Sequence, residues 1–315
     1  MHTPDVPQVV VTCLAGISII IIALIFIFVF FQAMPTIRTS GFGLITAAGF
    51  DTQISDAFYR RPDDPLVMFG MLGLIMGTLL TTGLALVCAT VLGLGASITI
   101  VEFCGERTAF VFTNIVRLLA AIPSVVYGLI GIIVIVPVIE NVFITVDMQI
   151  EYLEYFQMTG RNVLAGVTVL TFMIVPTIVS LSIDAISAVP NRLRETGYAF
   201  GMSRFRVIWK IVLPAGRNGI IAGILLGAGR GIGEAIAISM VCGGVGILPK
   251  LSLGMVNLLA PTLPLAAAII NKSEAIGAEQ VASALFTCGA LLLMFGAVLS
   301  ITARVISGKL IEKGA

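Results

Sequence analysis

The sequence predicts an all-α integral membrane protein with about six transmembrane helices and both termini in the cytoplasm. Of its 315 residues, 58% are hydrophobic and 11% are charged, whereas a soluble domain carries roughly 25% charged residues. Six apolar stretches reach the length of about 20 residues that a helix needs to cross the hydrocarbon core. The apolar character continues along the whole chain, which favours one membrane domain.

The expected spans differ in regularity. The first apolar run, residues 9–31, is longer than the core of a signal peptide, about 7–15 residues, so we expect a retained first span. The second and third stretches are over-long and contain glycine and proline, which predicts a bend or a short non-helical segment. The expected spans are residues 9–34, 66–101, 108–139, 160–187, 215–245 and 281–306.

A further apolar stretch, residues 248–270, resembles a span in composition alone. It contains Pro249, Pro261 and Pro264, and proline breaks a helix interior because it lacks the backbone donor and its ring clashes with the preceding turn. We therefore expect a broken segment that lies on the surface.

The basic residues predict the orientation, because cytoplasmic loops of membrane proteins carry an excess of lysine and arginine. One set of loops is rich in these residues, and the opposite set carries most of the acidic ones. We therefore expect both termini and the 188–214 loop in the cytoplasm. The loops expected on the outer side are residues 35–65, 140–159 and 246–280.

Several kinds of chemistry are excluded by composition. A net charge of +1 provides no basic field for nucleic acid. The only histidine is His2, which excludes histidine-dependent catalysis and histidine-ligated zinc, and the five cysteines include no C-x-x-C pair. The chain also lacks a G-x-x-x-x-G-K-[ST] phosphate-binding loop. We therefore expect no catalytic site, no metal site and no cofactor, and any ATP that drives this protein must be hydrolysed by another chain.

The 190–214 loop has the pattern of two short helices. Pro190 suits the first turn of a helix and Gly201 its C-terminal end. Ser203 is a suitable N-cap for a second helix, which Pro214 would interrupt. Its apolar residues follow helical spacing, and this stripe could dock in the groove of a partner protein or lie on lipid headgroups. The stripe consists of Phe205, Ile208, Trp209 and Val212.

Span five contains two charged residues, Arg230 and Glu234, which are four positions apart and would lie on one helix face. A charge at mid-helix costs roughly 2.5–3.5 kcal/mol on insertion scales, so it requires a reason. The pair could lock two helices together, or Arg230 could bind an oxyanion while Glu234 holds it in place. Glycines at every fourth position predict close helix packing: Gly223, Gly227 and Gly231, and Gly229 and Gly233.

The 190–214 loop resembles the coupling motif of permeases from ATP-binding-cassette (ABC) importers, E-A-A-x3-G-x9-I-x-L-P. Thr196 and Gly197 replace the two alanines. In that family the loop fits a groove in the ATPase subunit and transmits its closure to the spans, so the resemblance favours docking on a protein. The matching residues are Glu195, Gly201, Ile211, Leu213 and Pro214.

Other segments resemble the phosphate-specific permeases of this family, and the C-type (PstC-like) subunit most. The similarity extends from about residue 40 to the end. Gly231 and Ala235 stand where that group has alanine and threonine, and Val91 replaces a proline. The resembling segments are residues 229–235 (G-R-G-I-G-E-A), 122–128 (I-P-S-V-V-Y-G), and Phe69-Gly70 with 77–79 (F-G and G-T-L).

The resemblance implies a MetI-like ABC permease bundle in the cell inner membrane, with residues 1–65 as a first helix and outer loop and 66–315 as the core domain. It implies phosphate import by alternating access along a pathway that contains Arg230, Glu234 and Ser124. The implied partners are a second permease (PstA-like), two ATP-binding subunits (PstB-like) and an external phosphate-binding protein (PstS-like). Import of sulfate, molybdate or another oxyanion, or transport coupled to an ion gradient, remain alternatives.

Overall fold

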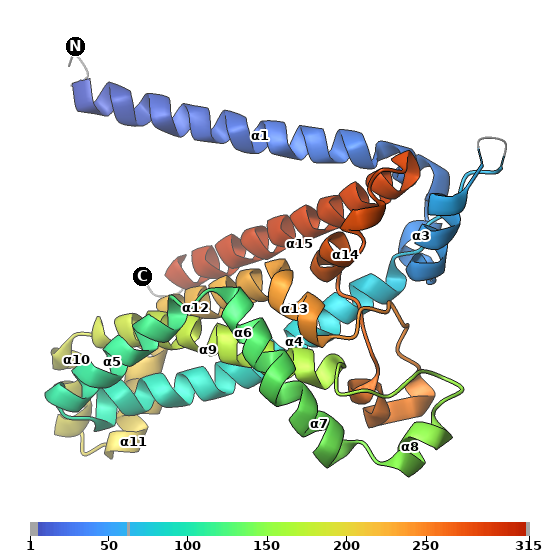
Figure 1. Cartoon of the computed structure of the whole chain (residues 1–315). Coiled ribbons are helices and arrows are strands. Elements are labelled where there is room, and N and C mark those ends of the chain that lie inside the picture. Colours follow the sequence, from blue (N-terminus) through green and yellow to red (C-terminus); the bar gives the residue numbers. More distant parts are fainter. Residues whose placement is uncertain (1–5, 62–63, 313–315) are drawn as a thin grey trace.

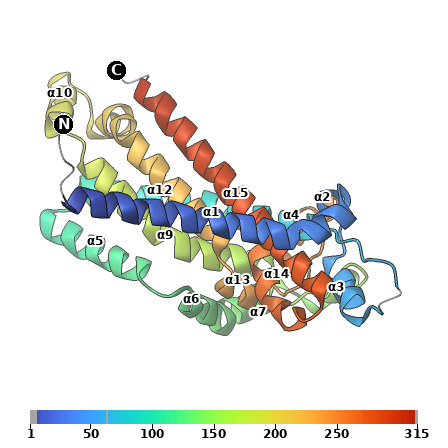
Figure 2. The same ribbon diagram turned by 90° about the horizontal axis from the view of Figure 1, so that it is seen from above.

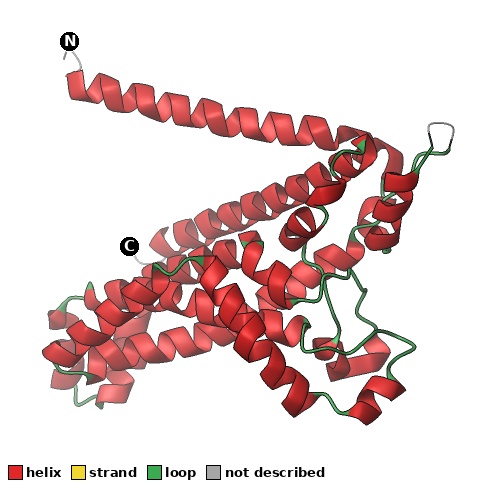
Figure 3. Ribbon diagram, viewed as in Figure 1, coloured by secondary structure: helices red, strands yellow, loops and turns green. Residues whose placement is uncertain are grey.

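A computed structural model describes residues 6–61 and 64–312, so that His2 lies outside the described residues. All regular secondary structure in the described residues is helical (Figure 3). Six helices are long and apolar enough to cross a membrane, which confirms the predicted fold class. These spans are Val11–Ser40, Leu72–Phe103, Ser124–Phe143, Val163–Ser187, Arg204–Gly233 and Glu279–Thr302.

The helices follow one another along the chain, and longer irregular segments, such as residues 152–162, lie between some of them (Figure 1). Three of the spans contain a π-helical turn, labelled η1, η2 or η3. The α-helices are α1 (Val6–Ser40), α2 (Gly43–Thr46), α3 (Phe50–Tyr59), α4 (Leu72–Ile98), α5 (Glu106–Ala120), α6 (Ser124–Ile130), α7 (Val136–Phe143), α8 (Val146–Glu151), α9 (Val163–Ser187), α10 (Asn191–Ala199), α11 (Arg204–Val207), α12 (Leu213–Gly233), α13 (Ile236–Val241), α14 (Leu265–Asn271) and α15 (Glu279–Glu312). The π turns are η1 (Thr99–Phe103), η2 (Gly131–Ile135) and η3 (Ile208–Val212), and the 3-10 helices are η4 (Leu251–Leu259) and η5 (Ser273–Ala275).

The connecting segments gather at two opposite ends of the bundle (Figures 1 and 2). The start of α1, the end of α15, and α10 with α11 lie at one end, whereas α3 and α8 lie at the other. The sequence predicts the same two groups, one cytoplasmic and one outer. The structure therefore agrees with six spans in which α1 begins and α15 ends on the same side as the 188–214 loop.

α9 is the most enclosed span and forms the centre of the bundle. Of its most apolar 18-residue stretch, 67% is buried, and α4, α5 and α12 pack around it. Its first turn is fixed by Asn162, whose side-chain oxygen accepts a hydrogen bond of 3.0 Å from the N–H of Ala165. Met173, Ile174 and Ile178 are fully buried, so α9 is the surface on which the other spans are positioned.

One glycine row in α12 explains how that helix approaches α9. A Cβ atom at Gly227 would lie 2.8 Å from a side-chain carbon of Ile174, and one at Gly231 would lie 2.9 Å from a side-chain carbon of Thr82 on α4. Glycine is therefore required for the close contact. The second row behaves differently, because a Cβ at Gly229 would meet nothing closer than 3.7 Å and one at Gly233 would meet no atom within 4 Å.

The long second and third stretches contain the irregularities that the sequence predicts. Residues 66–71 are non-helical before α4 begins. The third stretch breaks at residues 121–123, where Pro123 is extended (φ −58°, ψ 139°) and precedes α6. Because the break separates α5 from α6, the third span is residues 124–143 rather than 108–139.

The prediction that residues 248–270 lie on the surface is wrong for their second half. The segment is broken as expected, with η4 between Pro249 and Pro261 and α14 after Pro264, but Leu263 and Leu265 are fully buried. The N–H of Leu265 donates to Thr78 Oγ1 of α4 (2.9 Å), and the N–H of Thr262 donates to the carbonyl of Cys242 (2.7 Å). The segment re-enters the bundle because α4 and the chain after α13 satisfy its backbone polar groups.

α1 diverges from the bundle along most of its length (Figure 1). None of its most apolar stretch is buried, and it contacts α15 through its second half, where Phe28 packs edge-to-face on Phe286 (5.6 Å between ring centroids) and Thr36 donates to Ser283 (2.9 Å). Its remaining apolar surface must therefore be covered by lipid or by another membrane chain.

We predict that Gly227→Ala destabilises the bundle. The added methyl group would overlap Ile174, and overpacking of this kind costs about 1–3 kcal/mol in free energy of unfolding. Thermal unfolding of the purified protein in detergent measures the effect. Gly229→Ala is the matched control, because its methyl group has space and alanine favours the helix. Equal melting temperatures for the two variants would contradict the packing role of Gly227.

Candidate coupling loop and anion pathway

The 190–214 loop forms a helical hairpin, as the sequence predicts. α10 ends at Ala199 and Gly201 adopts the left-handed conformation (φ +72°). The N–H of Gly201 donates to the carbonyl of Tyr198 (2.9 Å) and the N–H of Met202 to that of Gly197 (3.1 Å), which together form a Schellman C-cap. Gly201 is therefore the hinge between the two helices.

The motif residues occupy two different positions in the hairpin. Glu195 and Gly201 are exposed on the first helix and the hinge, and Pro214 is exposed on the second helix. Ile211 and Leu213 are half-buried and pack against a small apolar cluster at the inner ends of α9 and α12. Glu195 is thus available to another protein, whereas Ile211 and Leu213 attach the hairpin to the spans.

The expected four-residue apolar stripe is divided between two surfaces, so the prediction that all four residues face outward is wrong. Ile208 is 2% exposed and Val212 is fully buried, because the hairpin folds back onto the bundle. Phe205 and Trp209 remain 68% and 56% exposed, with ring centroids 5.8 Å apart. The exposed apolar patch of the hairpin therefore consists of Phe205, Trp209 and Phe200.

Pro214 does not interrupt the second helix, contrary to the prediction. Residues 204–233 are continuously helical, and the π turn η3 directly precedes Leu213 and Pro214. A π turn is wider than an α turn and leaves room for the proline ring, which then sits in the first turn of α12, where its missing N–H is tolerated. The hairpin and span five are consequently one helix.

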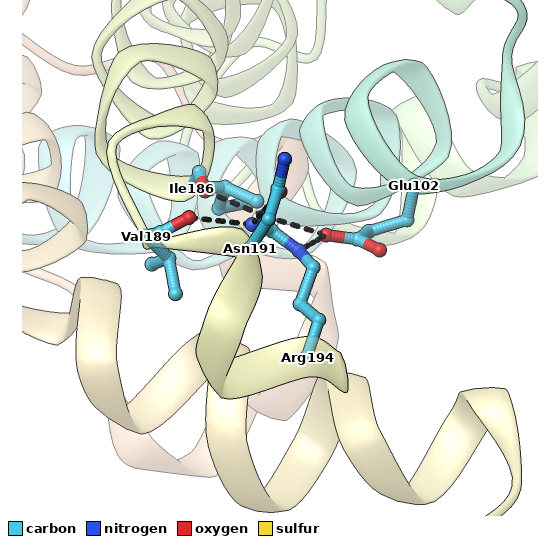
Figure 4. A network of polar contacts seen from close by, with 5 residues as sticks. All are labelled: Glu102, Ile186, Val189, Asn191 and Arg194. Atoms are coloured by element: carbon cyan, nitrogen blue, oxygen red, sulfur yellow. Dashed lines mark hydrogen bonds and ion pairs between the residues drawn. The ribbon is translucent and has the colours of Figure 1, made fainter. Parts of the chain in front are cut away.

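A buried ion pair joins the hairpin to the end of span two (Figure 4). Arg194 of α10 donates from Nε and Nη2 to Glu102 Oε1 of η1, at 3.2 and 3.1 Å. The same guanidinium donates to the carbonyls of Ile186 (2.9 Å) and Val189 (2.5 Å) and to Asn191 Oδ1 (3.2 Å). No pattern in the sequence singles out Arg194. Glu102, an acidic residue at the end of an apolar span, indicates that a basic partner must lie nearby, because a buried carboxylate requires one.

Arg230 lies in the last turn of α12, half-buried between three helices. Its Nη1 donates to Thr177 Oγ1 of α9 (3.0 Å) and to the carbonyl of Ala120 at the end of α5 (3.5 Å). It also lines a hollow of about 670 Å³ between α9, α12 and α15, together with Gly229 and Ser300. The arginine therefore borders an open groove on the membrane domain, and both of these hydrogen bonds come from Nη1 alone.

Glu234 does not share a helix face with Arg230, so that prediction is wrong. α12 ends at Gly233 and Glu234 is extended (φ −74°, ψ 115°). Its Oε1 accepts a hydrogen bond from the N–H of Ala237 at the start of α13 (3.0 Å). No ion pair between the two residues occurs in the part of the chain that the structure describes. Gly231 and Gly233 lower the helix propensity at this point, which favours the break.

The structure brings together the segments around residues 122–128 and 229–235. α6 packs on α13 through Gly128, where a Cβ atom would lie 2.9 Å from the Cα of Ala237. Tyr127 donates to the carbonyl of Leu119 (2.8 Å), across the same bend that Arg230 contacts. Ser124 is half-buried at the start of α6. The two segments therefore meet through Gly128 and Ala120, and no described hydrogen bond joins Ser124 to Arg230.

A second arginine lies along the same side of α9. Arg117 of α5 pairs with Asp184 of α9 at 3.1 Å, and both side chains are more than half exposed. Asp184 follows Thr177 by two helical turns, so the Arg230 and Arg117 contacts lie on one face of α9. Among the described residues, no group of three or more His, Cys, Asp or Glu side chains could hold a metal ion.

Sequence comparison matches residues 98–312 to the family described as "Binding-protein-dependent transport system inner membrane component". The chain belongs to this family. It is therefore a multi-pass protein of the inner membrane and a subunit of a transport system.

Two relatives illustrate the similarity. The chain is 36% identical over 192 residues to the "Probable ABC transporter permease protein YqgH" of Bacillus subtilis (strain 168), a match that covers 60% of this chain and 58% of that protein, less than two thirds of its length. It is 31% identical over 258 residues to the "Phosphate transport system permease protein PstC" of Pasteurella multocida (strain Pm70), covering 78% of this chain and 77% of that protein.

Solved structures confirm the fold. A bacterial alginate ABC transporter superposes with a TM-score of 0.55 at 14% identity and covers 97% of both chains. An inward-facing MetNI methionine ABC transporter superposes with a TM-score of 0.51 at 16% identity, covering 75% of this chain and 93% of that chain. The predicted MetI-like permease bundle is thus confirmed.

We predict that Gly197→Leu opens the hairpin. Gly197 faces α11 and η3, where even a Cβ atom would lie 3.0 Å from Val207 Cγ2 and 2.6 Å from Ile211 Cδ1. A leucine side chain would therefore separate the two helices. Limited proteolysis with trypsin, which cleaves after the loop arginines, should proceed several-fold faster. Thr196→Leu is the matched control, because Thr196 is adjacent to Gly197 in sequence but exposed. Equal cleavage rates would show that the two helices are not held together at Gly197.

Proposed function

We propose that this chain is a permease subunit of an ATP-driven phosphate importer. The proposal rests above all on Arg230. This residue borders an open groove of the membrane domain and belongs to a segment similar to those of phosphate-specific permeases. Intramembrane arginine is costly and by default functional, and its planar guanidinium matches the oxygens of a phosphate in a bidentate fork. Several relatives of about 31–32% identity are named phosphate transport system permeases, which supports this anion over sulfate or molybdate.

The proposed cycle is alternating access without covalent chemistry on this chain. Phosphate reaches Arg230 from the outer side and replaces its hydrogen bond to Thr177 with stronger charge-assisted ones. The hairpin at residues 190–214 faces the cytoplasm and docks on an ATPase through Glu195 and the Phe200, Phe205 and Trp209 patch. When ATP binding closes the ATPases, the hairpin moves, and the helix of residues 204–233 carries that motion to Arg230.

The remaining site residues have supporting roles in this proposal. Glu234 caps α13 and thereby maintains the helix break that directly follows Arg230. Ser124, half-buried at the start of α6, is a candidate pathway hydroxyl. Residues 66–315 form the core permease domain, and residues 1–65 form its peripheral helix and outer loop.

The proposed complex contains other chains. The exposed apolar surface of this one requires a second, PstA-like permease as well as lipid. Two PstB-like subunits bind and hydrolyse ATP in the cytoplasm, and a PstS-like protein delivers phosphate from outside. This chain itself holds no cofactor.

Reconstitution tests the proposed function. Proteoliposomes that contain this chain, the second permease and the ATPases should import radiolabelled phosphate when ATP and the binding protein are present, and vanadate should stop the import. Sulfate or molybdate uptake at equal rates would identify a different oxyanion importer. Uptake by this chain alone, driven by an ion gradient, would identify a secondary carrier and overturn the proposal.

We predict that Glu195→Ala weakens coupling to the ATPase. Loss of an exposed contact with the ATPase should lower phosphate transport per ATP hydrolysed by about 5-fold to 150-fold, the usual range of coupling between two sites. Transport and hydrolysis are measured in parallel in the same proteoliposomes. Glu106→Ala is the control, because Glu106 is an exposed acid outside the hairpin. Normal transport per ATP in the Glu195 variant would exclude a docking role for this residue.

We predict that Arg230→Gln abolishes phosphate transport in a complex that still assembles. Removal of one partner from a desolvated charged contact costs about 2–5 kcal/mol, so phosphate uptake should fall at least about 30-fold. Arg230→Lys keeps the charge without the fork and should be intermediate. Size-exclusion chromatography confirms assembly. An unchanged uptake rate would make Arg230 a packing residue.

A further inference from the structure

The hairpin has a second connection to the membrane domain besides its continuous helix into span five. Arg194 of α10 is held by Glu102 of η1, by the carbonyls of Ile186 and Val189, and by Asn191 (Figure 4). We propose that Arg194 is a positioning residue that fastens the first hairpin helix to span two, so that a displacement of the hairpin moves span two together with span five. This inference rests on the proposed function.

The Arg194–Glu102 contact is a buried ion pair and not a surface ion pair. Only 14% of the Arg194 side chain and 7% of the Glu102 side chain are exposed. Removing one member of such a pair leaves the other charge buried and uncompensated, which is strongly unfavourable. The pair therefore resists separation when the hairpin is displaced, and α10 and η1 should move as one body.

Arg194 also binds backbone carbonyls at the inner end of span four. The carbonyl of Ile186 lies in the last turn of α9, where carbonyls lack an intrahelical partner, and that of Val189 lies just beyond the C-cap. A cation at this position is favoured by the helix dipole. One guanidinium thus joins α10, the end of α9 and η1, and it uses donors on all three of its nitrogens. Lysine could not reproduce this planar set of donors.

Among the described residues, the Arg194–Glu102 pair is the only hydrogen-bonded or ionic link between span two and the first hairpin helix. α9 is joined to α10 through residues 188–190, and the second hairpin helix continues into α12, whereas α4 and η1 lie far from the hairpin in sequence. A second contact agrees with the fastening, because Arg204 at the start of α11 lies over the Phe103 ring of η1 at 4.7 Å. α4 in turn holds the re-entrant segment through Thr78, so its motion would reach the opposite end of the bundle.

Site-specific fluorescence in the assembled complex tests this inference. The accessible cysteines Cys13, Cys88 and Cys104 are replaced by serine, and one new cysteine is labelled with bimane, either at Tyr198 on α10 or at Thr99 on η1. Both positions are exposed. The probe is a nucleotide alone, a non-hydrolysable ATP analogue with Mg²⁺, so the readout does not depend on which anion is carried.

With Arg194 present, both labels should respond to the nucleotide. In Arg194→Gln, the Tyr198 response should persist, whereas the Thr99 response should fall at least about 5-fold, the lower bound of usual coupling between sites. Arg194→Lys should lie between. Arg192→Gln is the matched control, because Arg192 is an exposed arginine on the same helix, and both labels should respond there as in the parent protein.

The outcomes separate this inference from the proposed function. A full Thr99 response in Arg194→Gln would overturn the role of Arg194 while leaving the ATPase-coupled permease intact. A parent complex without a Tyr198 response would overturn the proposed coupling and this inference with it. A purely structural role would lower both responses together. If Arg194→Gln does not assemble, Glu102→Gln, in which the arginine keeps its backbone acceptors, must show the same selective loss at Thr99.

Discussion

Lipid surrounds most of this protein, and lipid tails are as apolar as leucine, so burial of apolar side chains does not by itself hold the spans together. Close packing has to do so, and the approach of α12 to α9 through Gly223, Gly227 and Gly231 is the contact on which the rest depends. It places Arg230 against Thr177. It also places the start of the same helix, with the hairpin attached, against the inner end of α9.

Where the regular helices end inside the bundle, backbone polar groups still find partners, because unpaired ones are costly in lipid. The re-entrant segment finds its partners on α4 and at Cys242, and the inner end of α9 finds one in Arg194. Arg230 differs, because it borders a hollow and is held by one threonine hydroxyl and one long contact to a carbonyl. That difference separates residues that maintain the architecture from the one that we assign to the transported anion.

Patterns with a simple physical origin could be read from the sequence. Span number follows from the length of apolar runs, and the Gly201 hinge follows from the need for a left-handed residue. The predictions that were wrong depend on tertiary contacts. The sequence of residues 205–212 does not indicate that Ile208 and Val212 face the bundle. The helical period places Glu234 beside Arg230, and only the end of α12 at Gly233 separates them. The Arg194–Glu102 pair joins residues 92 positions apart, which no local pattern predicts.

The unbroken helix from Arg204 to Gly233 fixes more than a path for motion. After the π turn η3, each residue of α12 contributes about 1.5 Å of length and about 100° of rotation. The distance and the angle between Leu213 and Arg230 are therefore set by the number of residues between them. One inserted residue would turn Arg230 away from Thr177 and the glycine row away from α9 at the same time. Evolution can therefore vary the composition of this stretch, within the limits of packing, but hardly its length.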